Sequence, residues 1–340
     1  MTQGVKIAPW LLPLAIGIGL ALGGSVPQAG QAFRLLIDPL LLGLLTLLFF
    51  EVRFEPLRHA RRHLPFLTLA LAANFLLIPL VGWGIASLFF SPESALFAGL
   101  LLYFLFPCTD WFLGFTRMAK GDVALGAVLL PVNLITQLIL FPVYLGLITG
   151  AQTGADLGGI KATLTQWFLL PLCCALGLRL ILTRLLSAEH FERISSRSGH
   201  LVSWMIALVA LCLFAQYTTT LAANTVAFIK ILAAVFLFFL LSWVIGELLA
   251  RWFRLSHGQH VLLVMTTAAR NAPLILGLTM IAIPDQPLIH AALIIGLLVE
   301  FPHLMALSRL FFRKRDGGES SANHPGSDPS LSKNPPRHEA

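Results

Sequence analysis

Long apolar stretches, separated by short polar segments, run through almost the whole chain. Because about 20 apolar residues cross a membrane as a helix, this pattern predicts ten membrane spans. Their approximate limits are residues 7–26, 33–52, 64–90, 94–117, 122–149, 160–185, 198–220, 225–250, 259–283 and 287–312. The stretches are continuous and rich in leucine, whereas the strands of a membrane β-barrel alternate between apolar and polar residues. We therefore expect an all-α polytopic membrane protein.

The first stretch follows a single lysine and also resembles the apolar part of a signal peptide. However, Ala21 to Ser25 match a cleavage site only loosely, and the rest of the chain is itself apolar. We therefore predict that residues 7–26 form the first span.

Basic residues fall mostly on one side of the predicted spans. Those that follow the even-numbered spans are Arg53, Arg58, Arg61, Arg62, Arg117, Lys120, Arg184, Arg193, Arg197, Arg251, Arg254, Arg313, Lys314 and Arg315. The other side has Arg34, Lys161 and Lys230. Because lysine and arginine accumulate in cytoplasmic loops, we predict a multi-pass protein of the plasma (inner) membrane with both termini in the cytoplasm.

The composition agrees with a membrane protein. Hydrophobic residues make up 57% of the chain and charged residues only 11%, which is too little polar surface for a soluble protein of 340 residues. The net charge of +7 resides in loops between spans and so indicates orientation, not a nucleic-acid partner. Glycine, serine, proline and charged residues dominate the C-terminus, which predicts a transmembrane domain over residues 1–316 and a disordered cytoplasmic tail over residues 317–340.

An internal repeat relates the two halves of the chain. Residues 112–122 read FLGFTRMAKGD and residues 275–285 read ILGLTMIAIPD, so that leucine, glycine, threonine, alanine and aspartate recur at an offset of 163. A repeat unit of five spans is odd-numbered, and its second copy must enter the membrane from the opposite side. The sequence therefore predicts an inverted five-plus-five repeat, with one copy over about residues 7–149 and the other over about residues 160–312.

The fourth and ninth spans are each interrupted by a helix breaker and a charge. The interruptions are Pro107-Cys108-Thr109-Asp110-Trp111 and Ala269-Arg270-Asn271-Ala272-Pro273. A charge in hydrocarbon is costly and usually faces the protein interior, and paired broken helices form the binding centre of many secondary transporters. We therefore predict that the two broken helices cross near the middle of the membrane.

The charges in the two interruptions have opposite signs. Because an unpaired charge at this depth costs several kcal/mol, we predict that Asp110 and Arg270 form an ion pair or share a hydrated cavity. A static pair that only locks the two helices together is the alternative.

Cys108 follows the breaker Pro107, where a thiolate offers a soft ligand for a thiophilic solute. The alternative is a small core residue, which is the role that we expect for Cys173, Cys174 and Cys212. No CxxC pair occurs, so we expect neither a disulfide framework nor a metal site.

Other polar residues inside the spans complete the predicted site. Thr109, Trp111, Thr266, Thr267 and Asn271 are expected to contact the solute, and Asn74, Asn133, Gln137 and Glu300 to line the cavity behind them. For each of these, an ordinary hydrogen bond between helices is the alternative. Glu300 has two further interpretations, as a proton carrier or as a partner of Arg309 at the cytoplasmic interface.

The residues around the first interruption resemble the bile acid:sodium symporter superfamily, and within it the arsenite permease branch. That branch has a cysteine in its fourth span, as at Cys108, followed at the same distance by an alanine–basic–glycine–acidic or amide run, as at Ala119-Lys120-Gly121-Asp122. The run from Lys120 to Leu125 is also similar to a helix junction of the bile-acid symporters. The resemblance implies ten helices in an inverted repeat, with a panel (first, second, sixth and seventh helices) packed on a core of six. It also implies alternating access and the export of arsenite or antimonite with participation of Cys108.

The ninth span departs from the pattern of that superfamily. Its sodium-coupled members and the arsenite permeases use a glutamate there, but no glutamate occurs between His260 and Pro284, and Arg270 stands in this span instead. A fixed positive charge disfavours Na⁺ by repulsion. We therefore predict coupling to protons rather than to Na⁺.

These features predict a secondary active transporter, not an enzyme, that exports arsenite or antimonite by alternating access. Its partners are the lipid bilayer, a small solute and protons, and no cofactor is expected. The first alternative is a sodium- or proton-coupled symporter of an organic anion whose carboxylate binds Arg270. The second is an intramembrane enzyme with Cys108 as its nucleophile, although no histidine stands beside either interruption to serve as its base.

Overall fold

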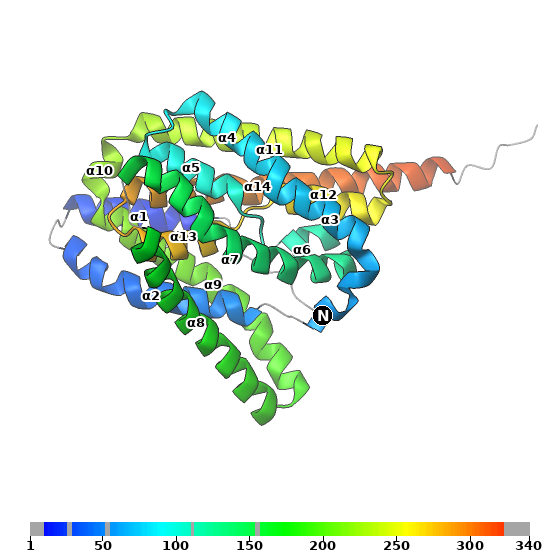
Figure 1. Ribbon diagram of the computed structural model, residues 1–340, viewed down its shortest axis with the longest axis horizontal. Coiled ribbons are helices and arrows are strands. Elements are labelled where there is room, and N and C mark those ends of the chain that lie inside the picture. Colours follow the sequence, from blue (N-terminus) through cyan, green and yellow to red (C-terminus); the bar gives the residue numbers. More distant parts are fainter. Residues whose placement is uncertain (1–9, 26–28, 52–54, 110–111, 154–156, 323–340) are drawn as a thin grey trace, which may run out of the picture.

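The computed structural model describes residues 10–25, 29–51, 55–109, 112–153 and 157–322, in which all regular elements are helices (Figure 1). They are α1 (Leu11–Ser25), α2 (Ala29–Glu51), the 3-10 helix η1 (Glu55–His63), α3 (Leu64–Ala72), the π-helix η2 (Ala73–Leu77), α4 (Ile78–Phe89), α5 (Ala95–Leu105), α6 (Phe112–Met118), α7 (Val123–Thr153), α8 (Leu157–Leu185), α9 (Ala188–Gln216), α10 (Thr218–Ala222), α11 (Thr225–Trp252), α12 (His257–Ala268), α13 (Ala272–Ala282) and α14 (Pro287–Ala322). The predicted all-α class is therefore confirmed.

The helices lie where the apolar stretches predicted them. The third stretch is covered by α3, η2 and α4 in line, and the fourth and ninth are divided into α5 and α6 and into α12 and α13. Within the described ranges, five helices are long and apolar enough to cross a membrane: Ala60–Phe89, Val123–Ile148, Glu189–Gln216, Thr225–Trp252 and Pro287–Phe311. Residues 317–322 of the predicted tail belong to α14, and residues 323–340 lie outside the described part of the chain.

The surface of the molecule carries many large apolar side chains. Six that are more than 60% exposed are Leu76, Leu80, Leu88, Ile139, Leu147 and Phe236. A soluble monomer rarely exposes apolar surface on this scale, whereas lipid tails solvate it well. The protein is therefore integral to a membrane.

The helices pack in two groups. In the first group, α9 packs against α1 and α2, and α2 also contacts α8. In the second group, α5 packs against α4 and α14, and α11 packs against α12 and α14. Figure 1 shows the first group in the lower left of the view, with the second group above it. Helix α13 contacts both groups, because it touches α2 and α8 as well as α14.

Capping residues and prolines define several ends of the short helices α5, α12 and α13 at the interruptions. Ser94 caps the start of α5, and Ser256 caps the start of α12 in a capping box. Phe106 is extended (φ −115°, ψ 118°) because the following Pro107 disfavours a helical conformation at the residue before it. Pro273 stands in the first turn of α13, where its missing N–H leaves no bond unmade.

Candidate functional site at the helix crossing

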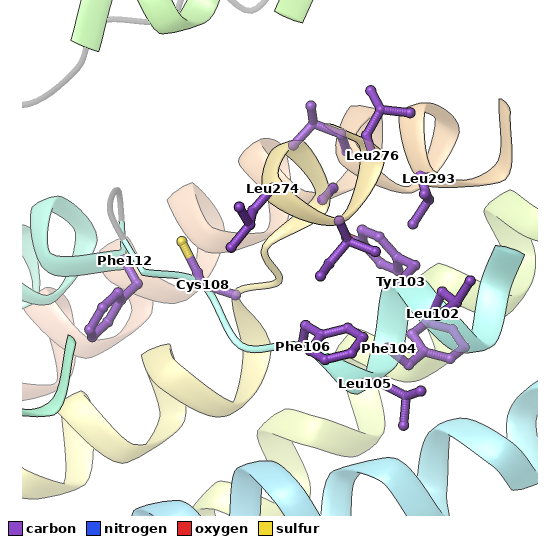
Figure 2. Close-up of a cluster of buried hydrophobic side chains, with 14 of the residues drawn as sticks. Leu102, Tyr103, Phe104, Leu105, Phe106, Cys108, Phe112, Leu274, Leu276 and Leu293 are labelled. Atoms are coloured by element: carbon purple, nitrogen blue, oxygen red, sulfur yellow. The ribbon is translucent and has the colours of Figure 1, made fainter. Parts of the chain in front are cut away.

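The two unwound segments pair with each other. The N–H of Cys108 donates to the carbonyl of Ala269 at 3.0 Å, and the N–H of Asn271 donates to the carbonyl of Phe106 at 2.9 Å. These bonds form an antiparallel bridge between residues 107 and 270, and Figure 2 shows the two segments meeting at Cys108. Each break therefore satisfies backbone groups that the other has freed from helical bonding.

The side chain of Arg270 binds the ends of both broken helices. Its Nη1 donates to the carbonyl of Phe104 at 2.9 Å, and its Nη2 donates to the carbonyls of Thr266 at 2.9 Å and Thr267 at 2.6 Å. These carbonyls belong to the last turns of α5 and α12, where a helix carries partial negative charge. The guanidinium is fully buried and lies 5.4 Å from the centre of the Phe238 ring.

Glu300 of α14 is the acidic residue that the structure places at Arg270. Its Oε1 accepts a hydrogen bond from the backbone N–H of Arg270 at 3.0 Å, and its Oε2 accepts one from the Tyr103 hydroxyl at 3.2 Å. Glu300 is fully buried, whereas Arg309, its alternative partner from the sequence, is exposed. The predicted partner Asp110 and its neighbour Trp111 lie outside the described residues.

Two predicted solute-contacting residues link the breaks directly. The amide Nδ2 of Asn271 donates to the hydroxyl of Thr109 at 2.9 Å, and both side chains are buried. Thr267 differs, because its hydroxyl donates to carbonyls of its own helix, Leu263 at 2.9 Å and Val264 at 3.2 Å. Thr267 therefore contributes to the crossing through its carbonyl rather than through its hydroxyl.

A second polar cluster lies beside the crossing, and we call Asn74, Asn133, Gln137 and Thr266 the amide cluster. The Nδ2 atoms of Asn74 and Asn133 both donate to the Thr266 hydroxyl, at 3.1 Å and 3.2 Å. Their amide oxygens are buried without a hydrogen-bond partner in the described structure, as are both polar atoms of Gln137, one turn along α7. Asn74 belongs to the π-helix η2, and such turns often occur at functional sites.

The cysteines occupy different environments. Cys108 is fully buried at the crossing, and Cys212 is buried in α9 as expected. Cys173 and Cys174 are exposed on α8, so the expectation that they are core residues is wrong. A weakly polar thiol is tolerated against lipid as well as in a core, and the apolar sequence around these two residues did not distinguish the two positions.

The crossing is closed in this conformation. Cys108, Arg270 and Glu300 are all fully buried. A surface hollow exists elsewhere, at the α6–α7 and α11–α12 junctions, and is lined by Lys120, Asp122, Ser256, His257, His260 and Phe311. A solute therefore reaches the crossing only after the helices around it move.

The sequence analysis missed Tyr103 and the backbone carbonyls that bind Arg270. The phenol stands in an otherwise apolar half-helix, four residues before Pro107. That position was a usable signal, because a buried tyrosine hydroxyl generally needs a partner. The carbonyls of Phe104, Thr266 and Thr267 gave no signal, since every residue has one.

Comparison with known proteins now assigns this architecture to a class. The chain matches the model of the Sodium Bile acid symporter family over residues 38–226, more than half of its length, and it belongs to this family. The symporters after which this family is named are membrane transporters. It is also 30% identical over 121 residues to "Uncharacterized protein YbaS" of Bacillus subtilis (strain 168), an alignment that covers 36% of this chain and 40% of that relative.

Proposed function

We propose that this transporter exports arsenite or antimonite in exchange for protons, by alternating access and without Na⁺. Its ten spans form an inverted five-plus-five repeat in the plasma (inner) membrane, with both termini in the cytoplasm. One observation carries the proposal: the Arg270 guanidinium binds the C-terminal carbonyls of both broken helices at their crossing.

The position of Arg270 bears on the coupling ion. In secondary transporters with broken helices, the C-terminal ends of the half-helices and the unwound carbonyls coordinate Na⁺. Here the guanidinium binds three such carbonyls and stays with the chain throughout the transport cycle. A second cation beside it would be repelled. Arg270 thus supplies the charge that a bound Na⁺ would supply, which favours coupling to protons.

The local geometry of the breaks supports an inverted repeat. Helices α5 and α6 flank the first interruption as α12 and α13 flank the second. Thr116 donates to the carbonyl of Phe112 at 2.8 Å, and Thr279, at the equivalent position of the second copy, donates to the carbonyl of Ile275 at 2.7 Å. Equivalent hydroxyl bonds in equivalent half-helices are expected of two copies of one unit. The four-helix group of α1, α2, α8 and α9 corresponds to the proposed panel.

The residues at the crossing favour a small thiophilic solute. Cys108 provides a soft ligand whose backbone is fixed by its bond to Ala269. Arsenite is an uncharged trihydroxide near neutral pH, and its hydroxyl groups are donors for the unused amide oxygens of Asn74 and Asn133. The Cys108 sulfur thus suits the arsenic atom, and the amide oxygens suit its hydroxyl groups.

The alternative of an organic anion is less well supported. Its carboxylate would need donors from Arg270, but Nη1 and Nη2 already bind three carbonyls. Only Nε lacks a partner among the described atoms, and it is buried. Binding an anion here would therefore require breaking bonds that hold the two half-helices.

The proposed topology is tested by single cysteines in a variant without Cys173 and Cys174. Reporters at Glu93 and Asn224 fall in loops after odd-numbered spans, and we expect both to react with an impermeant reagent added outside intact cells. Reaction of either reporter only after the membrane is opened would contradict the proposed orientation.

Transport is tested in proteoliposomes that contain the purified protein and arsenite. We expect arsenite flux to respond to a pH gradient and to be unchanged when K⁺ replaces Na⁺ on both sides. Flux that requires a Na⁺ gradient would refute proton coupling. Absence of arsenite flux under every gradient would refute the proposed solute.

A further inference from the structure

We propose that Glu300 is the site at which the coupling proton binds. The inference rests on the proposed proton-coupled transport and adds the group that carries the proton. Glu300 is fully buried in α14 and contacts the crossing through two separate donors. Burying a carboxylate at this depth costs free energy, and such residues are usually functional. The groups that contact Glu300 therefore indicate its role.

Both protonation states of Glu300 find hydrogen-bond partners in the observed geometry. When Glu300 is ionised, Oε1 accepts from the Arg270 N–H and Oε2 accepts from the Tyr103 hydroxyl, at 3.0 Å and 3.2 Å. The Tyr103 hydroxyl also lies 3.1 Å from the carbonyl of Gly296, one turn earlier in α14. When a proton binds at Oε2, Glu300 can therefore donate to the Tyr103 oxygen while Tyr103 donates to Gly296.

Gly296 makes room for this arrangement. A Cβ atom at this position would lie 2.7 Å from Cε2 of the Tyr103 ring, closer than packed carbon atoms allow. The glycine thus lets the Tyr103 ring approach α14 closely, so that the phenol reaches both the Gly296 carbonyl and Glu300. Tyr103 is the group that allows one site to accept and release a proton without leaving a buried polar atom unpaired.

Proton binding at Glu300 changes the electrostatics of the crossing. Glu300 interacts electrostatically with Arg270, and its ionised form offsets the buried guanidinium charge. Protonation removes the negative charge and leaves the Arg270 guanidinium with the three carbonyls and the Phe238 ring, none of which carries a full negative charge. A buried cation without a counter-charge favours a hydrated environment, so the protonated state favours a conformation in which water reaches the crossing.

The other groups around Glu300 do not offer an equivalent site among the described residues. Tyr103 contacts Glu300, and Cys108 interacts electrostatically with Tyr103 and Arg270; both are weak acids. His303 lies on the next turn of α14, with its ring stacked on Phe239 of α11 at 4.3 Å between ring centres. Helix α13 has no titratable side chain, and Arg117 of α6 is exposed.

Other carboxylates lie farther away or outside the described residues. Glu247 of α11 binds His260, whose ring contacts Phe311, three turns along α14 from Glu300. Asp110 lies outside the described residues and is the rival proton carrier. Glu300 and Asp110 are therefore the two candidates for the proton site, and the test compares variants of both.

Infrared difference spectra of the purified protein between high and low pH detect protonation directly. We expect acidification to produce the C=O band of a carboxylic acid that exchanges slowly in D₂O, as a carboxyl group shielded from water would. This band should be lost in Glu300→Gln and retained in the control Glu247→Gln and in Asp110→Asn. Its loss in Asp110→Asn with retention in Glu300→Gln would overturn the proposal, as would its absence from the wild type.

A second variant keeps the test decisive if Glu300→Gln does not fold. Tyr103→Phe removes the oxygen that accepts the hydrogen bond of the protonated carboxyl group. We expect its band at a higher frequency than in the wild type, because the acid has lost this partner. An unchanged band would show that the titrating acid is not in contact with Tyr103 and would overturn the proposal.

Arsenite flux in proteoliposomes separates this inference from the proposed function. We expect Glu300→Gln to carry arsenite down its own gradient but to lose the response to a pH gradient, while Glu247→Gln keeps it. A wild type that shows the infrared band but carries no arsenite would refute the solute and leave the proton site standing. A pH response retained in Glu300→Gln would refute Glu300 and leave the proposed function standing.

Discussion

The two buried polar clusters of this protein differ in how completely their hydrogen bonds are made. We call Arg270, Glu300 and Tyr103 the arginine cluster. In it, the guanidinium binds three carbonyls and the carboxylate accepts from two donors, and among the described atoms Nε of Arg270 lacks a partner. In the amide cluster, two asparagine oxygens and the whole Gln137 amide have no partner in the described structure.

We interpret the arginine cluster as structural and the amide cluster as a candidate ligand-binding site. A buried polar network in which most hydrogen bonds are made rigidifies the structure, whereas each unsatisfied buried group lowers stability and needs a functional reason. The arginine cluster fixes the two half-helices and, in the proposed mechanism, responds to a proton. The amide cluster is proposed to offer acceptors to a solute. Variants of the two clusters should therefore change stability in opposite directions.

Arg270→Ala should have the largest effect. It leaves three carbonyls without a donor and Glu300 without its counter-charge, and we expect a loss of about 3–5 kcal/mol, as for other broken buried ion pairs. Thermal unfolding in detergent should show a much lower midpoint, with little protein in the membrane. Arg117→Ala removes an exposed arginine from the same broken span and is the control. Equal stability of the two variants would contradict a structural role for the guanidinium.

Cys108→Ser should abolish arsenite efflux while leaving the amount of folded protein normal. Serine keeps the size and polarity of the side chain but removes the soft sulfur ligand. Arsenite resistance of cells and flux in proteoliposomes measure the effect. Cys212→Ser, at the buried cysteine of α9, should retain both activities. Full resistance in Cys108→Ser would exclude a thiolate ligand.

Gln137→Leu should raise stability and lower transport. The amide of Gln137 is buried without partners in the described structure, and replacing such a group by an apolar one of similar size should stabilise the fold by about 1–2 kcal/mol. The same change removes polar atoms from the proposed solute path. Thr136→Val, on the neighbouring position of α7, is the matched control. A destabilised Gln137→Leu variant would show that the amide does have partners.

Thr109→Val and Asn271→Leu should have the smallest effects and should not be additive. Each breaks the same 2.9 Å hydrogen bond between the two interruptions, so a double-mutant cycle should give a coupling of about 1 kcal/mol. Unfolding midpoints of the four proteins provide the measurement. Strict additivity would mean that the bond contributes nothing to the stability of the crossing.

Hydrophobic patterning predicted the helices well, because long apolar runs and prolines are local properties of the chain. The interruption at Pro107 and the start of α13 at Pro273 follow directly from proline geometry. The boundary before the C-terminal tail was less accurate, since α14 includes residues after 316. Helix ends without a proline or a cap depend on tertiary contacts, which a local pattern does not contain.

The buried polar residues at the crossing were more predictable than their bonding. Polarity within an apolar span singled out Arg270, Asn271, Thr266 and Glu300, and the structure brings these four residues together at the crossing, while their role in transport stays a prediction. The sequence did not assign Glu300 to Arg270, because their proximity depends on how α14 packs against α12 and α13, the helices on either side of Arg270. The backbone carbonyls around the guanidinium were also missed, since residue type says nothing about which carbonyls a crossing leaves unpaired.

The most direct test of the account concerns Na⁺ itself, because its central claim is that Arg270 takes the place of a coupling cation. Thermal unfolding of the purified protein in Na⁺ should be compared with unfolding at the same ionic strength in K⁺. A ligand at free concentration c that binds the native state stabilises it by RT ln(1 + c/Kd), so the midpoint rises with ligand concentration. We predict identical midpoints in the two salts, and a midpoint that rises with Na⁺ concentration would contradict the claim.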